Sequence, residues 1–220
     1  MNSLRMLIFL GLLACIISII SINNSAFAQN SNYKVAAGGG NGTYILMKYM
    51  PNFLSINLGD SVTWYNPTDV EEPHTITFVM DKGYFPPPAF PFNISNTALV
   101  NPFISNLNAE PLILPNNNKQ NNDNESKTTT KIIVDNARVY NPTVIDSTGN
   151  NITILLPNSN YVMTGGEKYI NSGWMLPEGK IPPGLAPITK FTVTFEKSGT
   201  YNYLCIIHPW MSGSIVVKET

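Results

Sequence analysis

The sequence is poor in histidine, in cysteine and in charge. Its 220 residues include two histidines, His74 and His208, and two cysteines, Cys15 and Cys205. This scarcity excludes every metal site that needs three or more imidazoles. Charged residues make up 12% of the chain, and the net charge is −1. A nearly neutral chain offers no polycation for a phosphate backbone, so we expect no nucleic-acid partner.

The N-terminal residues predict export. A short positive region ending at Arg5 precedes an apolar run over residues 6–22, and Ala26-Phe27-Ala28 supplies a small-x-small cleavage pattern. We therefore expect residues 1–28 to be a signal peptide. Because the run is at the lower limit for crossing a bilayer, an uncleaved N-terminal anchor is the alternative, and it would be the protein's one link to the membrane.

The predicted location is outside the cytoplasm, in a secreted form, in a periplasm-like space or at the cell surface. Glycosylation sequons occur at Asn41, Asn93, Asn124 and Asn151, which fits exposure at a cell surface. If the leader is removed, Cys205 is the one remaining thiol and no internal disulfide can form. An unpaired thiol outside the cytosol oxidises unless it is buried or bound to a metal.

The composition, with 17 Pro and 15 Gly, favours a turn-rich all-β domain. Residues 29–43, rich in Gly and Asn, are expected to form a flexible linker without core residues. A single domain is expected over residues 44–220. Its clearest strand signals are alternating apolar residues on both sides of Gly59-Asp60, a run from His74 to Val79 that begins at the histidine, and the segments 191–195, 201–205 and 215–217.

Residues 83–188 have a different texture and are predicted to form an insertion within the domain. Short strands are expected at 131–134, 137–140 and 151–156, with a hairpin turn at 147–150. A separate small β subdomain is the alternative. Outside the leader, helical periodicity is not convincing in any window.

Four residues of the sequence have side chains that could together bind a metal ion. Cys205, His208 and Met211 follow one another at intervals of three, and His74 lies 131 positions before the cysteine. A mononuclear copper site of the trigonal kind needs one thiolate, two imidazoles and a weak axial thioether. Singly, each residue would suit a bland role, as a small buried hydrophobe, a core methionine or a polar surface residue. Together they predict a copper site, whereas zinc would find the thioether a poor fourth ligand.

Two stretches resemble a known family. They are Ile56-x-Leu58-Gly59-Asp60-Ser61-Val62-Thr63-Trp64-x-Asn66 with His74-Thr75, and Gly199-Thr200-Tyr201-x-Tyr203-x-Cys205-x2-His208-Pro209-x-Met211-x-Gly213. They resemble the type 1 (blue) copper cupredoxins of the plastocyanin, pseudoazurin and halocyanin kind. The chain as a whole also looks like cell-surface cupredoxins of ammonia-oxidising archaea.

The resemblance implies a Greek-key β-sandwich that binds one copper through His74, Cys205, His208 and Met211. The chain departs from small cupredoxins in its long insertion between the first histidine and the C-terminal ligand loop. Backbone N–H groups near Asn66 or Thr75 are expected to donate to the cysteine sulfur.

The implied function is the shuttling of single electrons between a redox donor and acceptor. The partners would dock transiently on a monomer near His208, Pro209 and Trp210, with Pro73 or the loop at residues 84–88 extending the patch. An enzyme is not expected, because multicopper oxidases and copper nitrite reductases need more histidines and a binuclear copper site needs a second cysteine. A cell-surface copper-delivery protein is the alternative function, and a purely structural sandwich is the third interpretation.

Overall fold

The computed structural model describes residues 30–86, 89–95, 99–105, 111–114, 129–183 and 185–219. The predicted leader at residues 1–28 and the sequon at Asn124 lie outside the described residues. Within those ranges, the helices are all too short or too polar to cross a membrane.

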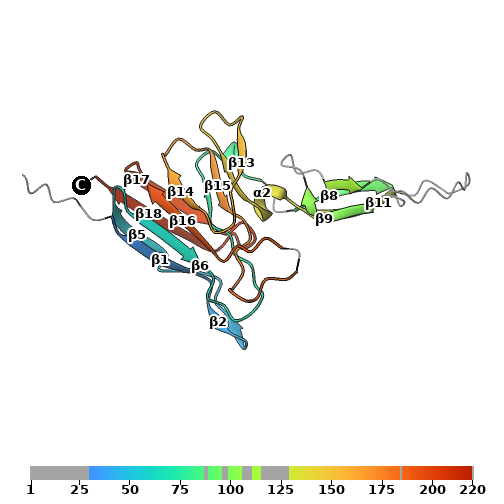
Figure 1. Cartoon of the computed structure of the whole chain (residues 1–220), viewed down its shortest axis with the longest axis horizontal. Helices are drawn as coiled ribbons and strands as arrows, with labels where there is room; N and C mark the ends of the chain where they lie inside the picture. Colours follow the sequence, from blue (N-terminus) through green and yellow to red (C-terminus); the bar gives the residue numbers. More distant parts are fainter. Residues whose placement is uncertain are drawn as a thin grey trace, which may run out of the picture. The chain divides into compact units, whose positions relative to one another are not determined.

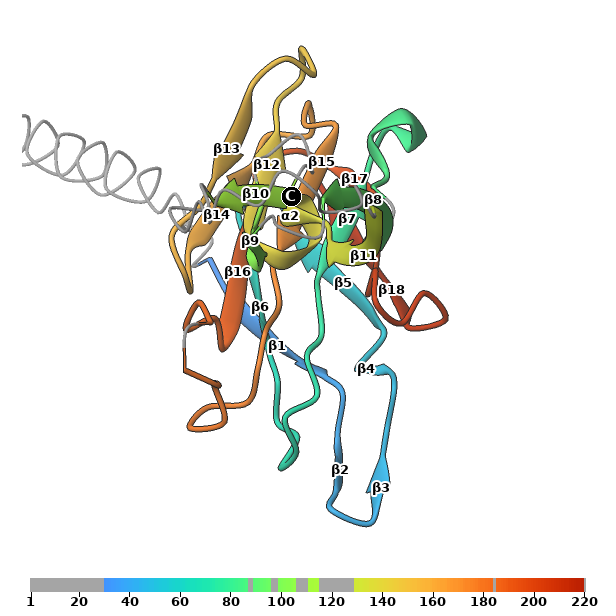
Figure 2. The same cartoon turned by 90° about the vertical axis from the view of Figure 1, so that its right-hand side faces the viewer.

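Two β-sheets form the body of the structure (Figures 1 and 2). The first sheet has the strand order β14 (Asn160–Met163), β16 (Lys190–Phe195), β6 (Ser61–Tyr65), β1 (Asn32–Ala37) and β4 (Tyr49–Met50). The second sheet has the order β13 (Ile152–Ile154), β12 (Pro142–Ile145), β15 (Tyr169–Ser172), β7 (Thr77–Val79), β17 (Gly199–Leu204), β18 (Ser212–Lys218) and β5 (Phe53–Asn57). Most neighbours within a sheet are not consecutive in the chain, as a Greek-key path requires. The predicted all-β sandwich is confirmed.

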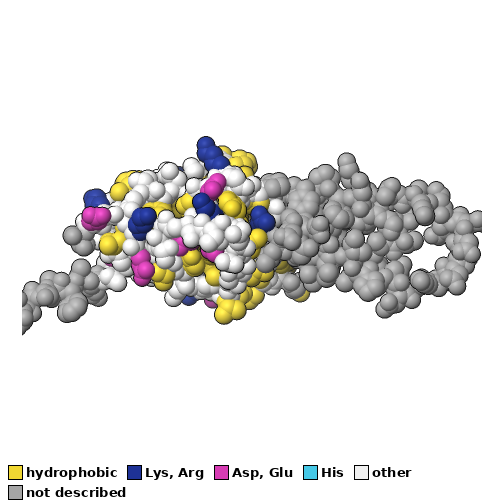
Figure 3. Space-filling view, turned by 90° about the horizontal axis from the view of Figure 1, so that it is seen from above, with side chains coloured by type: hydrophobic (Ala, Val, Ile, Leu, Met, Phe, Trp, Pro, Cys, Tyr) yellow, Lys and Arg dark blue, Asp and Glu magenta, His cyan; other side chains and the backbone are white. Residues whose placement is uncertain are grey.

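Smaller elements complete the described chain. β2 (Gly40–Asn41) pairs with β3 (Tyr44–Ile45), and Figure 2 shows this hairpin projecting beyond the sheets. β8 (Ala89–Ser95) pairs with β11 (Thr129–Asp135), and β9 (Leu99–Ser105) pairs with β10 (Pro111–Leu114). The two short helices are η1 (Lys82–Tyr84) and α2 (Ala137–Tyr140). Figure 3 shows basic and acidic side chains interspersed over the face that it presents, in keeping with the near-neutral sequence.

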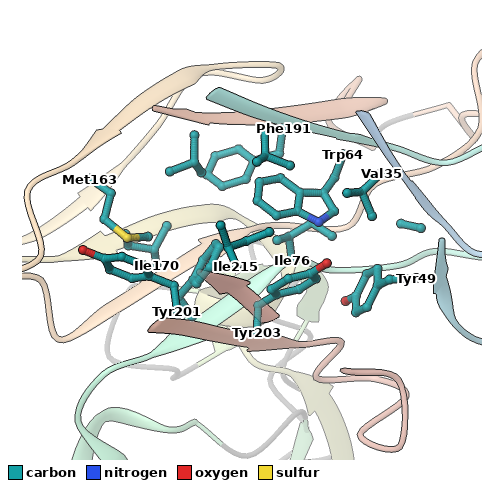
Figure 4. Packing of buried hydrophobic residues seen from close by; sticks show 14 of the residues in the cluster. Val35, Tyr49, Trp64, Ile76, Met163, Ile170, Phe191, Tyr201, Tyr203 and Ile215 are labelled. Carbon is teal, nitrogen blue, oxygen red and sulfur yellow. The ribbon is translucent and has the colours of Figure 1, made fainter. Parts of the chain in front are cut away.

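Aromatic side chains from both sheets meet at the centre of the sandwich (Figure 4). Trp64, on the first sheet, is fully buried, and its ring centroid lies 5.8 Å from that of Phe78 and 5.2 Å from that of Tyr203 on the second sheet. Both contacts are edge-on, the arrangement that aromatic quadrupoles favour. The alternation predicted around Trp64 therefore produces the contact that joins the two sheets.

The predicted linker at residues 29–43 is wrong for most of its length. Asn32–Ala37 form strand β1, which pairs in parallel with β6 and antiparallel with β4. Val35 and Ala37 are fully buried in the core. The Gly/Asn-rich stretch that suggested a tether begins with Gly38 and Gly39, which are buried directly after β1, and only its later residues form the exposed β2–β3 hairpin.

Two local predictions need correction. Residues 137–140 form one helical turn rather than a strand, because the side chain of Asn136 caps it by accepting from the N–H of Arg138. Strand β7 begins at Thr77, whereas His74 makes an isolated bridge to Met175. The two strands predicted around Gly59-Asp60 are confirmed as β5 and β6, and the turn joins the second sheet to the first.

The long insertion is present, but its second half belongs to the sandwich. β12 and β15 lie in the second sheet, where β15 pairs with β7, and β14 pairs with β16 in the first. The predicted strand at 131–134 and the turn at 147–150 are confirmed by β11 and by the β12–β13 hairpin. The part of the insertion from Pro142 onward therefore contributes strands to the two main sheets and is not an addition outside them.

Candidate metal centre

Three of the four predicted ligands converge at one end of the sandwich. One ligand atom from each of His74, Cys205 and His208 lies within 4.8 Å of the others. The histidine ring centroids are 5.1 Å apart. Residues separated by more than a hundred positions thus meet because β7 pairs with β17, the strand that leads into Cys205.

His74 is held by its backbone and left open at its ring. Its N–H donates to the carbonyl of Met175 at 3.0 Å, and the N–H of Met175 donates back at 2.8 Å. The ring is fully buried, yet neither Nδ1 nor Nε2 has a hydrogen-bond partner among the described residues. Burial, together with the neighbouring His208, lowers the pKa of His74 to about 4. The ring is therefore neutral at physiological pH, with a nitrogen lone pair free to bind a metal.

Cys205 is buried beside the segment that carries His74. Its sulfur accepts a hydrogen bond from the N–H of Thr75 at 3.3 Å, as predicted for Thr75. The N–H of Ile206 donates to the Thr75 hydroxyl at 2.9 Å. Burial raises the pKa of the Cys205 thiol, and hydrogen bonds from Thr75 and from the backbone of the ligand loop oppose that rise. A bound cation would supply the remaining stabilisation that a thiolate needs here.

Asn66 has a different role from the one predicted. Its side-chain amide donates to the carbonyl of Glu72 at 2.8 Å and to that of Met175 at 3.0 Å. Its Oδ1 accepts from the N–H and hydroxyl of Thr68. Asn66 therefore links the backbone at Glu72, just before His74, to the backbone of Met175, the bridge partner of His74. The hydrogen bond to the sulfur comes from Thr75.

The ligand loop closes on itself through its own backbone. The N–H of Cys205 donates to the carbonyl of Met211 at 3.0 Å, His208 donates to Cys205 at 3.2 Å, and Met211 donates to His208 at 2.8 Å. These bonds place the three residues on one tight turn between β17 and β18. Met211 is buried in the core cluster, and its role as an axial ligand remains a prediction.

His208 lies between the sulfur and a carboxylate. Its Nδ1 is 3.6 Å from Sγ of Cys205, and its Nε2 is 2.9 Å from Oε1 of Glu72. Glu72 was not among the predicted site residues. The available signal was its position, since Glu71-Glu72 directly precedes Pro73-His74.

The predicted docking residues lie at the surface. Trp210 is 68% exposed, and its ring centroid lies 5.6 Å from that of His208. Pro209 is exposed as well, and the side chain of His208 retains 12% exposure. The site therefore has one buried histidine and one that reaches toward solvent.

The residues present fit a copper ion. A buried histidine with two unpartnered ring nitrogens is costly unless something binds it. A thiol and a second imidazole face the same point, which is the donor set that copper favours. The cluster is able to bind one copper ion.

Comparison with known proteins gives matches among solved structures. No family model and no curated protein matches the chain. A methionine-to-alanine mutant of amicyanin with Cu(I) is 15% identical, with 85% of this chain and 82% of that chain covered and a TM-score of 0.33. A purple cupredoxin from Nitrosopumilus maritimus is 16% identical, with 84% and 99% covered and a TM-score of 0.30. A pseudoazurin from Sinorhizobium is 16% identical, with 86% and 75% covered and a TM-score of 0.30.

These solved structures are cupredoxins. Copper binding in this chain is inferred from its own geometry, namely the convergence of His74, Cys205 and His208.

Proposed function

We propose that this protein is an exported blue copper protein that shuttles single electrons. Its ligands are His74, Cys205 and His208, with Met211 as the axial thioether. The observation that carries the proposal is the buried His74 ring, which has no partner at either nitrogen among the described residues and faces a thiol and a second imidazole. A structural sandwich would have no use for such a ring, because burying it without a partner destabilises the fold.

Each ligand is held in place by hydrogen bonds of the backbone. The Met175 backbone fixes His74, the Thr75 N–H stabilises the sulfur of Cys205, and the closed loop fixes His208 and Met211. Copper, when bound, supplies a one-electron couple. A rigid ligand frame suits both oxidation states, because little rearrangement then accompanies the transfer.

Electrons would enter and leave through His208. Its ring lies beside the exposed Trp210, so a donor or acceptor docking on Pro209 and Trp210 comes within a short distance of the site. Small apolar patches of this kind suit brief encounters between redox proteins. Export follows from the predicted leader at residues 1–28.

A reversible redox titration tests the proposal. Protein beginning at residue 29 is loaded with Cu(II), cycled with a reductant and an oxidant, and challenged with chelators in both states. The proposal expects a single one-electron wave and retention of copper throughout. Release of copper on reduction would instead indicate the delivery protein.

The axial role is tested by Met211→Leu. Loss of a thioether ligand is expected to shift the reduction potential, whereas Met163→Leu, a buried methionine on β14, serves as the control and should leave it unchanged. Equal potentials for both variants would remove Met211 from the ligand set.

A further inference from the structure

The outward edge of His208 is occupied by an acidic side chain. Oε1 of Glu72 lies 2.9 Å from Nε2 of His208, while Nδ1 of the same ring faces Sγ of Cys205 at 3.6 Å. One ring nitrogen therefore meets a carboxylate, which can only accept a hydrogen bond, and the other faces the candidate metal position.

Glu72 is fixed independently of His208. Its N–H donates to the carbonyl of Val70 at 2.8 Å, and its own carbonyl accepts from Nδ2 of Asn66 at 2.8 Å. The same Asn66 amide holds Met175, which in turn bridges His74. The backbone hydrogen bonds that position His74 therefore also position the carboxylate of Glu72 beside His208.

The two histidines differ in this respect. His74 has no hydrogen-bond partner at either ring nitrogen within the described chain, whereas His208 has a charged acceptor. The side chain of Glu72 is 28% exposed and that of His208 is 12% exposed, so water screens this contact less than it screens an open surface ion pair.

We propose that Glu72 is a positioning residue for His208, holding the proton on Nε2 so that Nδ1 is presented to the metal and strengthening the imidazole as a donor. The inference rests on the proposed copper site. A carboxylate acceptor behind a metal-bound imidazole fixes the tautomer and raises the basicity of the ligand. A stronger donor with a negative charge behind it favours the oxidised metal, so Glu72 lowers the reduction potential.

The metal-free protein tests the positioning part. With two histidines in the chain, ¹⁵N-labelled imidazole signals are readily assigned to His74 and His208. Nuclear magnetic resonance of the metal-free protein at neutral pH is expected to show His208 as a single tautomer protonated at Nε2. In Glu72→Ala the same ring should become a mixture of tautomers. A mixture in the unmodified protein, or no change in the variant, would overturn the proposal.

The copper-loaded protein tests the electronic part. Glu72→Gln removes the charge but keeps an oxygen acceptor, and Glu71→Gln removes an exposed neighbouring charge as the matched control. We expect Glu72→Gln to weaken the preference for the oxidised metal about tenfold relative to Glu71→Gln, a shift of about 59 mV toward higher potential for one electron. The difference should persist in high salt, because contact effects are screened less than long-range ones.

The outcomes distinguish failure of the role of Glu72 from failure of the proposed copper site. Equal potentials for Glu72→Gln and Glu71→Gln, in a protein whose copper is blue and reversible, would overturn the role of Glu72 and leave the proposed function standing. Loss of the difference in high salt would reduce Glu72 to a remote surface charge and also overturn the role. An unmodified protein that forms no type 1 copper site would overturn both.

Discussion

Gly38 lies directly against the ring of His74. A Cβ at Gly38 would sit 2.3 Å from Nε2 and 2.8 Å from Cδ2 of that histidine, and the glycine has φ +86°. Gly38 follows the last residue of β1, so the N-terminal strand forms a wall of the candidate copper site. A segment that composition suggested was a tether thus limits where the first ligand can lie.

Gly38→Ala should therefore damage the site as well as the fold. An alanine there must overcome both the left-handed backbone and the contact with His74. Gly179→Ala is the matched control, because Gly179 has φ +75° and, among the described residues, no atom within 4 Å of its would-be Cβ. We expect the control to lower the free energy of unfolding by about 1 kcal/mol. Gly38→Ala should lower the free energy of unfolding by more than the control does, and it should also weaken copper binding. Equal effects of the two variants in denaturation and in copper titration would contradict the contact between Gly38 and His74.

Thr75 is expected to hold the ligand loop through its hydroxyl. Thr75→Val keeps the backbone donor to sulfur but leaves the buried N–H of Ile206 without its acceptor. The expected loss is about 1–3 kcal/mol in urea denaturation. Thr75→Ser retains the hydroxyl and should retain most of the stability. Unchanged stability in Thr75→Val would contradict the account, because the Ile206 N–H would then not depend on the hydroxyl.

Val35 provides a direct test of strand β1. It is fully buried opposite Trp64, whereas the adjacent Lys34 is exposed on the other face of the strand. Val35→Ala is expected to lower the free energy of unfolding by about 2–3 kcal/mol, and Lys34→Ala by much less. Indifference to the Val35 change would mean that residues 32–37 are a linker after all.

Glu167 predicts a pH dependence that does not involve the metal. Burial raises the pKa of this carboxyl, but hydrogen bonds from Thr164, Gly165 and Tyr161 outweigh it and hold the pKa below its usual value. A pKa lowered by folding stabilises the folded state fully above the unfolded value of about 4.3, and this contribution is lost as the pH falls.

Urea denaturation between pH 7 and pH 3 measures this contribution. The unmodified protein should lose stability on acidification below about pH 4.3. Glu167→Gln should be less stable at neutral pH and lose less on acidification. Parallel pH profiles for the two proteins would show that the carboxylate contributes nothing to acid sensitivity.

The candidate site could be predicted from sequence because its residue types are scarce. His74, Cys205 and His208 are nearly all that the chain has of their kinds, so one metal chemistry accounts for them together. The strands next to them could also be predicted, since Trp64 and Tyr203 lie in alternating runs with one buried face.

The rest depended on tertiary contacts that a local pattern does not carry. Strand β1 looked like a linker because its neighbours are glycines, and its burial comes from pairing with β6 and β4. Residues 137–140 looked like a strand, and the cap from Asn136 made them a helical turn. Glu72 was missed because no local sequence pattern distinguishes it from other surface glutamates. Its role depends on the tertiary contact with His208, which lies far away in the sequence.

The most direct test of the copper site is the visible spectrum together with the electron paramagnetic resonance of the Cu(II)-loaded protein. Cys205→Ser serves as the matched variant, since it removes the sulfur and little else. We predict an intense blue thiolate-to-copper band with a compressed copper hyperfine splitting, lost reversibly on reduction and absent from the variant. A colourless protein, or a tetragonal copper signal shared by both proteins, would contradict the account.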